Sequence, residues 1–314
     1  MATVSLVLIL VHRMNKSGTL INIAITALAP VIWGSTYIVT TQTLPVGIPL
    51  IASVIRALLA GIILLLICRV RPHGFWWLKI AVVSFLNIGL FFYCLFAAAY
   101  FLPGGLASLV MSCQPIIVMV VGALVFRQKL SIMYMLSAVV GVTGISLLVL
   151  NSAVHLNIQG VIIGLLGTTS MALGILLTRY WGRPTNMSLL AFTGWQLTLG
   201  GVMLLPVALL LEKLPSHLTL INILGYGWLS LAGGVFGYFI WFRGIERLPP
   251  VTISFLGFMS SLSACVLGYL ILGQTFTHLQ LIGCLAIIIA IYLASPPREK
   301  PKLGFRPKQK KLRQ

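Results

Sequence analysis

The chain has 314 residues, of which 59% are hydrophobic and only 8% are charged. Soluble domains are about 25% charged, and so few charges cannot cover a water-facing surface, which excludes a soluble globular protein. The formal net charge of +18 does not indicate nucleic-acid binding, because the Lys and Arg residues lie in short gaps between apolar runs and in the C-terminal tail. The composition therefore predicts a membrane protein.

The first 19 residues are expected to be an N-terminal extension. Residues 1–11 are apolar like the core of a secretory signal peptide, but no basic segment precedes them and no small-residue cleavage site follows. The run is also too short to cross a bilayer. Because Met14 offers a second start, we expect residues 1–13 to be dispensable.

Ten apolar runs follow in chain order, each long enough to cross about 30 Å of hydrocarbon as a helix. They are too long for the strands of a barrel, and a helix satisfies its own backbone hydrogen bonds in lipid. The sequence therefore predicts an all-α membrane protein with ten transmembrane helices. The expected spans are 20–41, 48–68, 76–98, 104–126, 131–150, 159–178, 187–210, 222–243, 250–272 and 278–295.

Positive charge is distributed unequally between the two sides of these spans. With ten spans, 19 of the 21 Lys and Arg residues fall on one side, Lys213 falls on the other, and Arg56 lies inside the second span. Cytoplasmic loops are enriched in Lys and Arg. We therefore expect both termini on the cytoplasmic side, an N-in/C-in topology.

The two halves of the chain match each other at fixed offsets. Each half holds five spans, an odd number, so the second half enters the membrane in the opposite orientation. We expect two inverted five-helix repeats, 20–150 and 157–295, an architecture typical of transporters with a site between the repeats. A structural bundle that arose by duplication is the alternative. The matching pairs, at offsets of 146 and 140 residues, are Pro103 with Pro249, Gly122 with Gly268, Gln128 with Gln274, and Gly61 with Gly201.

Polar and aromatic residues inside the spans indicate a candidate cavity. Residues 29–45 (APVIWGSTYIVTTQTLP), which begin inside the first span, place Trp33 and Tyr37 on one helix face. Such rings offer apolar surface with one hydrogen-bonding group each. Helix packing is the alternative, since Gly and Ser let backbones approach closely. The candidate substrate-binding residues are Trp33, Ser35, Tyr37, Arg56, Asn87, Gln114, Gln196, Tyr238, Trp241 and Ser261, with Tyr93, Ser112, Thr169, Trp195 and Ser260 as further candidates for the cavity wall.

Arg56 is the most informative of these residues. It lies about 12 Å below the outer boundary by helix rise, where a charge costs several kcal/mol unless it is paired or hydrated. No span contains a deep Asp or Glu as its partner, so carbonyls, hydroxyls, water or an anionic substrate group must stabilise it. Two roles remain open: Arg56 binds a substrate carboxylate, or it has a fixed structural role, in which it bonds to carbonyls near a helix break or extends outward to the membrane surface. Its counterpart in the second repeat is Gln196.

The sequence contains no motif for catalysis or for a cofactor. It has no P-loop, metal-ligand cluster or paired carboxylates, its five Cys residues show no Cys-x-x-Cys spacing, and its five His residues fall at span ends or in loops. We therefore predict no catalytic residue, no metal and no cofactor, and a transporter that runs on gradients. A passive channel and a membrane-embedded enzyme are the alternatives. Glu246 lies between Arg243 and Arg247, where we expect an ion pair.

Several segments resemble a known family. The stretches WGSTYIVT, LIASVIRALLAG, NIGLFFYCLFAAAYFLPGG, SMALGILLTRYWGRP, LAFTGWQLTLGG and FGYFIWFRGIERLP are similar to the drug/metabolite transporter superfamily, and within it to the EamA family of bacterial ten-span exporters, most of all its PecM-like branch. The resemblance covers residues 20–295. It implies a cytoplasmic-membrane exporter of small metabolites, such as amino acids, with a central cavity between two five-helix repeats. Family members often carry Gly-Glu-x-Leu after spans four and nine, where this chain has Gln128 and Gln274, which puts local charge balance in doubt.

The C-terminal tail, residues 296–314, holds eight basic residues and one acidic residue. Such a composition cannot bury a core, and we expect a disordered segment that contacts anionic lipid of the bilayer. The expected partners are thus a small-molecule substrate and lipid, with no nucleic acid. The sequence leaves open whether the chain is a monomer or a homodimer.

Overall fold

The computed structural model describes residues 2–101, 110–127, 131–149, 157–215, 217–273 and 277–295. All regular elements in these ranges are helices, which confirms the all-α prediction. The α-helices are α1 (Ala2–Thr43), α2 (Pro49–Cys68), α3 (Trp76–Ser84), α4 (Leu90–Phe101), α6 (Gln114–Leu124), α7 (Ile132–Val149), α8 (Ile158–Trp181), α9 (Leu189–Leu211), α10 (Leu220–Trp228), α11 (Gly237–Arg247), α12 (Pro250–Leu256), α13 (Met259–Leu272) and α14 (His278–Leu293), and the π-helices are η1 (Phe85–Gly89) and η2 (Leu229–Phe236).

The helices of the described residues have the length and composition of a multi-pass membrane protein. Seven helical segments are long and apolar enough to cross a bilayer, and three shorter apolar helices accompany them. The shorter ones, Gln114–Leu124, Ile132–Leu147 and His278–Leu293, lie within the fourth, fifth and tenth expected spans. The start of the fourth span and the C-terminal tail lie outside the described residues.

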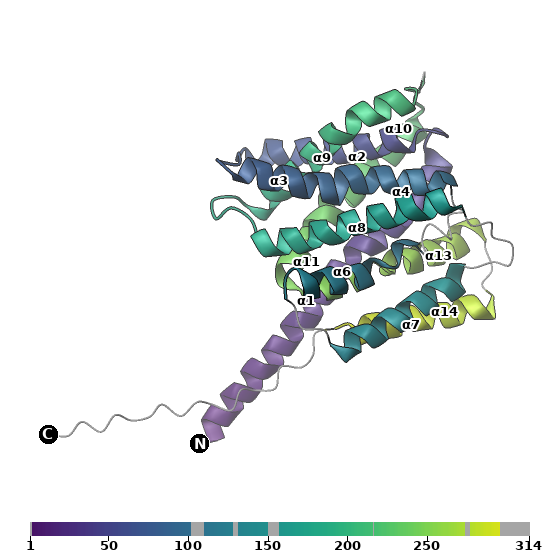
Figure 1. Cartoon of the computed structure of the whole chain (residues 1–314). Coiled ribbons are helices and arrows are strands. Elements are labelled where there is room, and N and C mark those ends of the chain that lie inside the picture. The colour runs from purple at the N-terminus through teal and green to yellow at the C-terminus, as the bar shows by residue number, and fades with distance from the viewer. Residues whose placement is uncertain are drawn as a thin grey trace.

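Helix α1 joins the expected N-terminal extension, residues 1–19, to the first expected span. The backbone is helical without interruption from Ala2 to Thr43 and continues through Pro30. Its N-terminal part projects beyond the rest of the bundle (Figure 1). A helix of 42 residues is about 63 Å long, roughly twice the thickness of the hydrocarbon core, so the projection follows from helix length.

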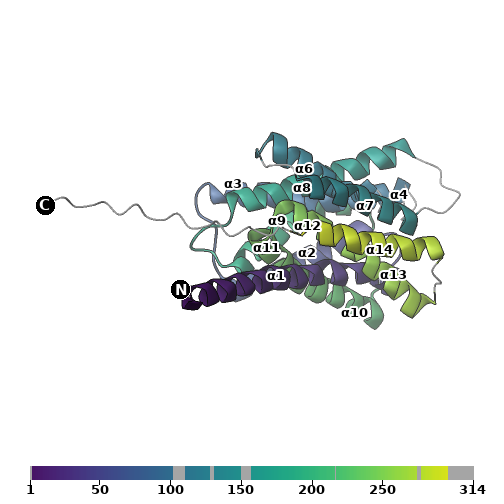
Figure 2. The same ribbon diagram turned by 90° about the horizontal axis from the view of Figure 1, so that it is seen from below.

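The remaining helices form a bundle with a regular pairing pattern. Figure 1 shows α9, α2 and α10 along one edge and α7 and α14 along the opposite edge, and Figure 2 shows α1 beside α13. Helix α2 packs along α9, and α7 packs along α14. Helix α1 packs on α11 and α13, while α8 packs on α4 and α6. The pattern is unchanged when the helices of the two halves are exchanged in pairs: α1 with α8, α2 with α9, α4 with α11, α6 with α13 and α7 with α14.

Four helix interruptions lie within the part of the bundle that the structure describes. The π-helices η1 and η2 interrupt the third and eighth expected spans. Turns at residues 112–113 and 257–258 interrupt the fourth and ninth. Asn87 in η1 and Gly233 in η2 are 146 residues apart, the offset of the sequence repeat, and the two turns are 145 apart. The interruptions therefore occur at matching places in the two halves.

Polar contacts between the two halves mark the two ends of the bundle. At one end, the Glu212 carboxylate accepts from the backbone N–H groups of Leu50 (2.8 Å) and Ile51 (2.7 Å) at the start of α2. We call this the Glu212 end. At the other end, the Arg243 guanidinium donates to the Asn22 side chain (3.0 Å) and the Trp195 indole to the Val70 carbonyl (2.8 Å). We call this the basic end, because α8 and α11 both finish there in arginines.

Candidate functional site

The first of two polar clusters surrounds Arg56. The Arg56 guanidinium and the Trp33 indole both donate to the carbonyl of Gly233 in η2, at 3.3 and 2.9 Å. The guanidinium carbon lies 5.7 Å from the ring centres of both Phe92 and Tyr238. A π-helix shifts the backbone hydrogen-bond register, and the Gly233 carbonyl is available to both side chains. We call this group the Arg56 junction.

Aromatic rings supply the stabilisation that the sequence did not reveal for Arg56. The side chain is only 9% exposed, and cation–π contacts with desolvated rings are worth about 2 kcal/mol each. The Trp33 ring centre lies 4.9 Å from that of Tyr238 and 5.2 Å from that of Trp241. Of the candidates, Trp33 and Tyr238 meet at Arg56, and Trp241 packs on Trp33. Phe92 was missed, because nothing in an apolar run distinguishes one phenylalanine from another.

The second cluster surrounds Asn87 in η1. The Asn87 amide donates to the Thr178 hydroxyl (3.2 Å) and to the Gln196 side-chain carbonyl (3.1 Å). Asn87 is 3% exposed and Gln196 is fully buried. The Asn87 oxygen and the Gln196 amide nitrogen have no hydrogen-bond partner among the described residues. We call this group the Asn87 junction.

The two junctions occupy matching places at opposite depths. Arg56 is the eighth residue of α2, which starts at the Glu212 end, and Gln196 is the eighth residue of α9, which starts at the basic end. Each side chain reaches the π-helix of the opposite half. Arg56 and Gln196, which the repeat predicts to be counterparts, therefore also contact counterpart elements.

The turns in the fourth and ninth spans also lie against each other. Gln114 begins α6 and is buried, and its side-chain oxygen lies 3.6 Å from the position that a Cβ atom on Gly257 would occupy. Ser260 donates to the Gly257 carbonyl (2.9 Å), and the neighbouring Ser261 is partly buried. Broken helices near the bilayer centre are typical of transporter binding sites.

Other candidates lie away from these clusters. Ser35 donates to the Ile32 carbonyl (2.7 Å) and accepts from the Trp228 indole (2.9 Å), so it faces α10 and not the Arg56 junction. Tyr93 is exposed, and Trp195 bonds at the basic end. Ser112 is buried, and Thr169 is partly buried. The side chain of Tyr37 lies outside the described residues.

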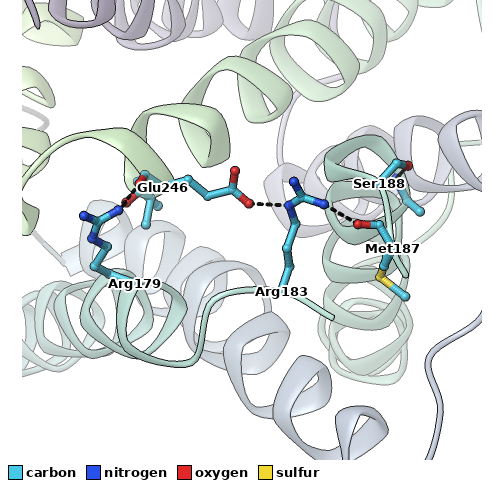
Figure 3. Close-up of polar contacts among 7 residues, drawn as sticks. Arg179, Arg183, Met187, Ser188 and Glu246 are labelled. Atoms are coloured by element: carbon cyan, nitrogen blue, oxygen red, sulfur yellow. Dashed lines mark hydrogen bonds and ion pairs between the residues drawn. The ribbon is translucent and has the colours of Figure 1, made fainter. Parts of the chain in front are cut away.

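A pocket of about 360 Å³ opens at the basic end. Arg183 donates to the Glu246 carboxylate (2.7 Å) and to the Met187 carbonyl, while Arg179 donates to the carbonyls of Ile245 (3.3 Å) and Glu246 (Figure 3). We call this the basic pocket, and its lining residues are Thr178, Arg179, Gly182, Arg183, Pro184, Thr185 and Glu246.

The ion pair of Glu246 differs from the predicted one. We expected pairing with Arg243 or Arg247 on the same helix, but Glu246 pairs with Arg183 from the loop after α8, while Arg243 turns to Asn22. Gly182 allows Arg183 to approach Glu246, because it turns the chain just before Arg183. Its φ of +67° belongs to a backbone conformation that residues other than glycine rarely adopt.

The basic pocket was missed in the sequence because Arg179 and Arg183 counted only as loop charges. Thr178 forms part of its lining and also accepts the hydrogen bond from Asn87. The pocket therefore borders the Asn87 junction directly. Among the described residues, no group of three His, Cys, Asp or Glu side chains has the arrangement of a metal site.

Comparisons with known proteins agree with this architecture. The model of the EamA-like transporter family matches residues 20–150 and again 158–295. Protein PecM of Dickeya dadantii is 47% identical over 84% of this chain and 89% of its own length. A probable amino-acid metabolite efflux pump of Salmonella typhimurium is 26% identical over 85% of this chain and 92% of its own, and the uncharacterized inner membrane transporter YedA of Escherichia coli K12 is 26% identical over 84% and 87%.

A solved crystal structure shares the fold. It is 16% identical in sequence, with a TM-score of 0.72 over 87% of this chain and 97% of the other. The family match covers most of the chain in two successive segments, and the helices have the lengths that a membrane transporter requires. The chain therefore belongs to the EamA-like transporter family, and it is a multi-pass membrane transporter and not an enzyme.

Proposed function

We propose that this protein is a secondary transporter of the bacterial inner membrane that exports small metabolites by alternating access. In this proposal its ten spans form two inverted five-helix repeats, 20–150 and 157–295, with both termini in the cytoplasm. The observation that carries the proposal is the matched set of four helix interruptions, at η1 and η2 and at the turns of residues 112–113 and 257–258.

Matched interruptions fit a rocking mechanism. Alternating access moves one repeat against the other around a site near the bilayer centre. Arg56 and Gln196 each bond across to the opposite half at a π-helix, and helix interruptions are places where a helix changes direction at low cost. Relative movement of the two halves would therefore alter the contacts of the two junctions. The proposed wall of the pathway consists of Trp33, Arg56, Asn87, Gln114, Gln196, Tyr238, Trp241 and Ser261.

The side chains and the relatives support a proposal for the substrate class. Rings of Trp33, Tyr238 and Trp241 offer apolar faces beside polar groups, which suits a small amphipathic molecule. One relative carries the name of an amino-acid metabolite efflux pump. We propose amino acids and related amphipathic products as substrates.

Transport in liposomes tests the function. The purified protein is reconstituted, and uptake of amino acids and amphipathic metabolites is measured with and without imposed proton and sodium gradients. A transporter gives saturable uptake and counterflow of labelled substrate against unlabelled substrate. A passive channel, the alternative, gives flux that neither saturates nor shows counterflow, and that result overturns alternating access.

Fusion proteins test the topology. A fluorescent protein at residue 314 is expected to fluoresce, and an alkaline phosphatase at the same position is expected to be inactive, because the positive residues gather on one side of the spans. Phosphatase activity at residue 314 contradicts the ten-span, N-in/C-in arrangement.

The two roles of Arg56 give different transport phenotypes. In a structural role, Arg56→Gln lowers transport of a carboxylated substrate and of its amide analogue by the same factor. In a substrate-binding role, the carboxylated substrate is lost selectively, and Arg56→Lys rescues only part of it because a point charge lacks the planar two-pronged geometry. The contact with Gly233 and the two flanking rings favour the structural role.

A further inference from the structure

The basic pocket combines opposite charges with open hydrogen-bonding positions. Two guanidinium groups, one carboxylate and two threonine residues line a space of about 360 Å³, within the range of small-molecule sites, roughly 300–1,000 Å³. The pocket opens at the basic end and borders the Asn87 junction through Thr178. Thr178 therefore belongs both to the pocket wall and to the polar interior of the bundle.

Glu246 is the carboxylate in the described part of the chain that is free to accept a ligand. The other acid there, Glu212, uses both oxygens to cap α2. Glu246 uses one oxygen for Arg183, and its second oxygen has no hydrogen bond to the residues that the structure describes. An ammonium group is the natural partner of such an oxygen.

Arg183 and Arg179 are held in place independently of the Glu246 carboxylate. Arg183 donates through one terminal nitrogen to the Met187 carbonyl, and Arg179 donates to the backbone at the end of α11. Backbone anchors keep both guanidinium groups at the pocket when the ion pair opens. The second terminal nitrogen of Arg183 makes no hydrogen bond within the described ranges, and a guanidinium edge binds a carboxylate with two parallel hydrogen bonds.

Opening the Arg183–Glu246 pair costs little. The two side chains are 36% and 27% exposed, and exposed ion pairs contribute about 1 kcal/mol or less. A ligand with one carboxylate and one ammonium group replaces each half of this pair with an equivalent contact. A ligand with only one of these charges leaves either Arg183 or Glu246 without a partner.

We infer that the basic pocket is a loading site for a small zwitterion, whose carboxylate binds Arg183 and whose ammonium group binds Glu246. The inference rests on the proposed transport function and adds to it a binding site at the basic end of the bundle. After loading, Thr178 and the Asn87 junction lead from the pocket toward the bundle interior. The unpartnered oxygen of Asn87 and nitrogen of Gln196 are the next polar groups on that route.

Direct binding to the full chain in lipid nanodiscs tests this site. Isothermal titration with each of the 20 standard amino acids identifies the tightest ligand, and its amide and its deaminated analogue are then titrated. We expect the zwitterion to bind at least 10-fold more tightly than either analogue. Equal binding of all three, or no binding of any amino acid, overturns the inference.

Matched variants locate the binding. Glu246→Gln preserves shape and removes the negative charge, whereas Arg183→Gln removes the cation and also shortens the side chain. Each is expected to weaken amino-acid binding at least 10-fold. Arg247→Gln is the control, because Arg247 is exposed, adjacent to Glu246 in sequence and outside the pocket lining. If Arg183→Gln fails to fold, Glu246→Gln alone decides. Wild-type affinity in a folded Glu246→Gln protein overturns the inference.

Transport measurements separate this inference from the proposed function. If the wild type transports amino acids and Glu246→Gln transports them with an unchanged KM, transport stands and the loading site fails. If the wild type transports no solute of the panel but binds a zwitterion in a Glu246-dependent way, the site stands and the proposed function fails.

Discussion

Helices α2 and α9 pack along each other, yet they carry different chemistry at matching positions. Arg56 on α2 is a cation held by one carbonyl and two aromatic rings. Gln196 on α9 is a neutral amide that bonds to another amide. The place of each side chain is therefore repeated, while its charge is not.

The surroundings explain this difference. The ring faces of Phe92 and Tyr238 carry partial negative charge and stabilise a guanidinium, whereas Asn87 presents an amide N–H to Gln196, which repels a cation. The Asn87 junction in turn borders the basic pocket, through Thr178. We interpret the Arg56 junction as the brace between the halves and the Asn87 junction as the part that communicates with the surface.

Exchanging the two side chains has the largest expected effect. Gln196→Arg places a second charge against Asn87 without an anion or a ring to stabilise it, and we expect a loss of about 4 kcal/mol in the free energy of unfolding. Arg56→Gln retains a donor for the Gly233 carbonyl. It removes the two cation–π contacts together with the desolvation cost of the buried charge, which oppose each other, so the expected net loss is about 1 kcal/mol. Equilibrium unfolding in mixed micelles measures both. Equal losses contradict the contrast between the junctions.

The glycines that separate α2 and α9 also differ in their surroundings. A Cβ atom on Gly61 lies 2.6 Å from the backbone nitrogen of Thr198, whereas one on Gly201 meets the end of the Leu58 side chain at 2.8 Å. Backbone cannot yield as a leucine can, so we expect Gly61→Ala to cost about 3 kcal/mol and Gly201→Ala about 1 kcal/mol. The same unfolding assay reports the order, and a larger loss for Gly201→Ala refutes it.

Single hydrogen bonds distinguish the junctions on a smaller scale. Thr178→Val removes an acceptor and leaves one Asn87 N–H buried without a partner, at an expected cost of about 2 kcal/mol. Trp33→Phe removes a donor to the Gly233 carbonyl, which Arg56 continues to satisfy, so the expected cost is about 1 kcal/mol. A cost for Trp33→Phe that exceeds that for Thr178→Val contradicts this account.

The starts of the two helices provide the smallest contrast. The N-terminus of α2 is capped from the other half by Glu212, whereas that of α9 is capped by its own Ser188, which accepts from Ala191 (3.2 Å). Glu212→Gln and Ser188→Ala are each expected to cost about 1 kcal/mol. Only Glu212→Gln is expected to increase hydrogen exchange at both Leu50 and the C-terminal turn of α9, since only that cap joins two helices. Exchange confined to one helix contradicts this.

The sequence by itself determined the features that each segment carries alone. Hydropathy depends on the residues within one run, so the membrane class, the all-α fold and the places of the helices followed from composition and length. The repeat offset likewise placed Arg56 opposite Gln196 before any contact was known. The family resemblance is confirmed by the two matched segments.

Only the tertiary structure decided which side chains meet. Gly233 lies 177 residues from Arg56, and Glu246 lies 63 from Arg183; no local pattern indicates either pairing. The hydropathy pattern did not predict the π-helices either, because a single extra residue in a turn leaves hydropathy unchanged. Contacts between helices depend on packing angles and side-chain directions that are set only when the bundle assembles. For that reason only the tertiary structure identified the basic pocket and the aromatic partners of Arg56.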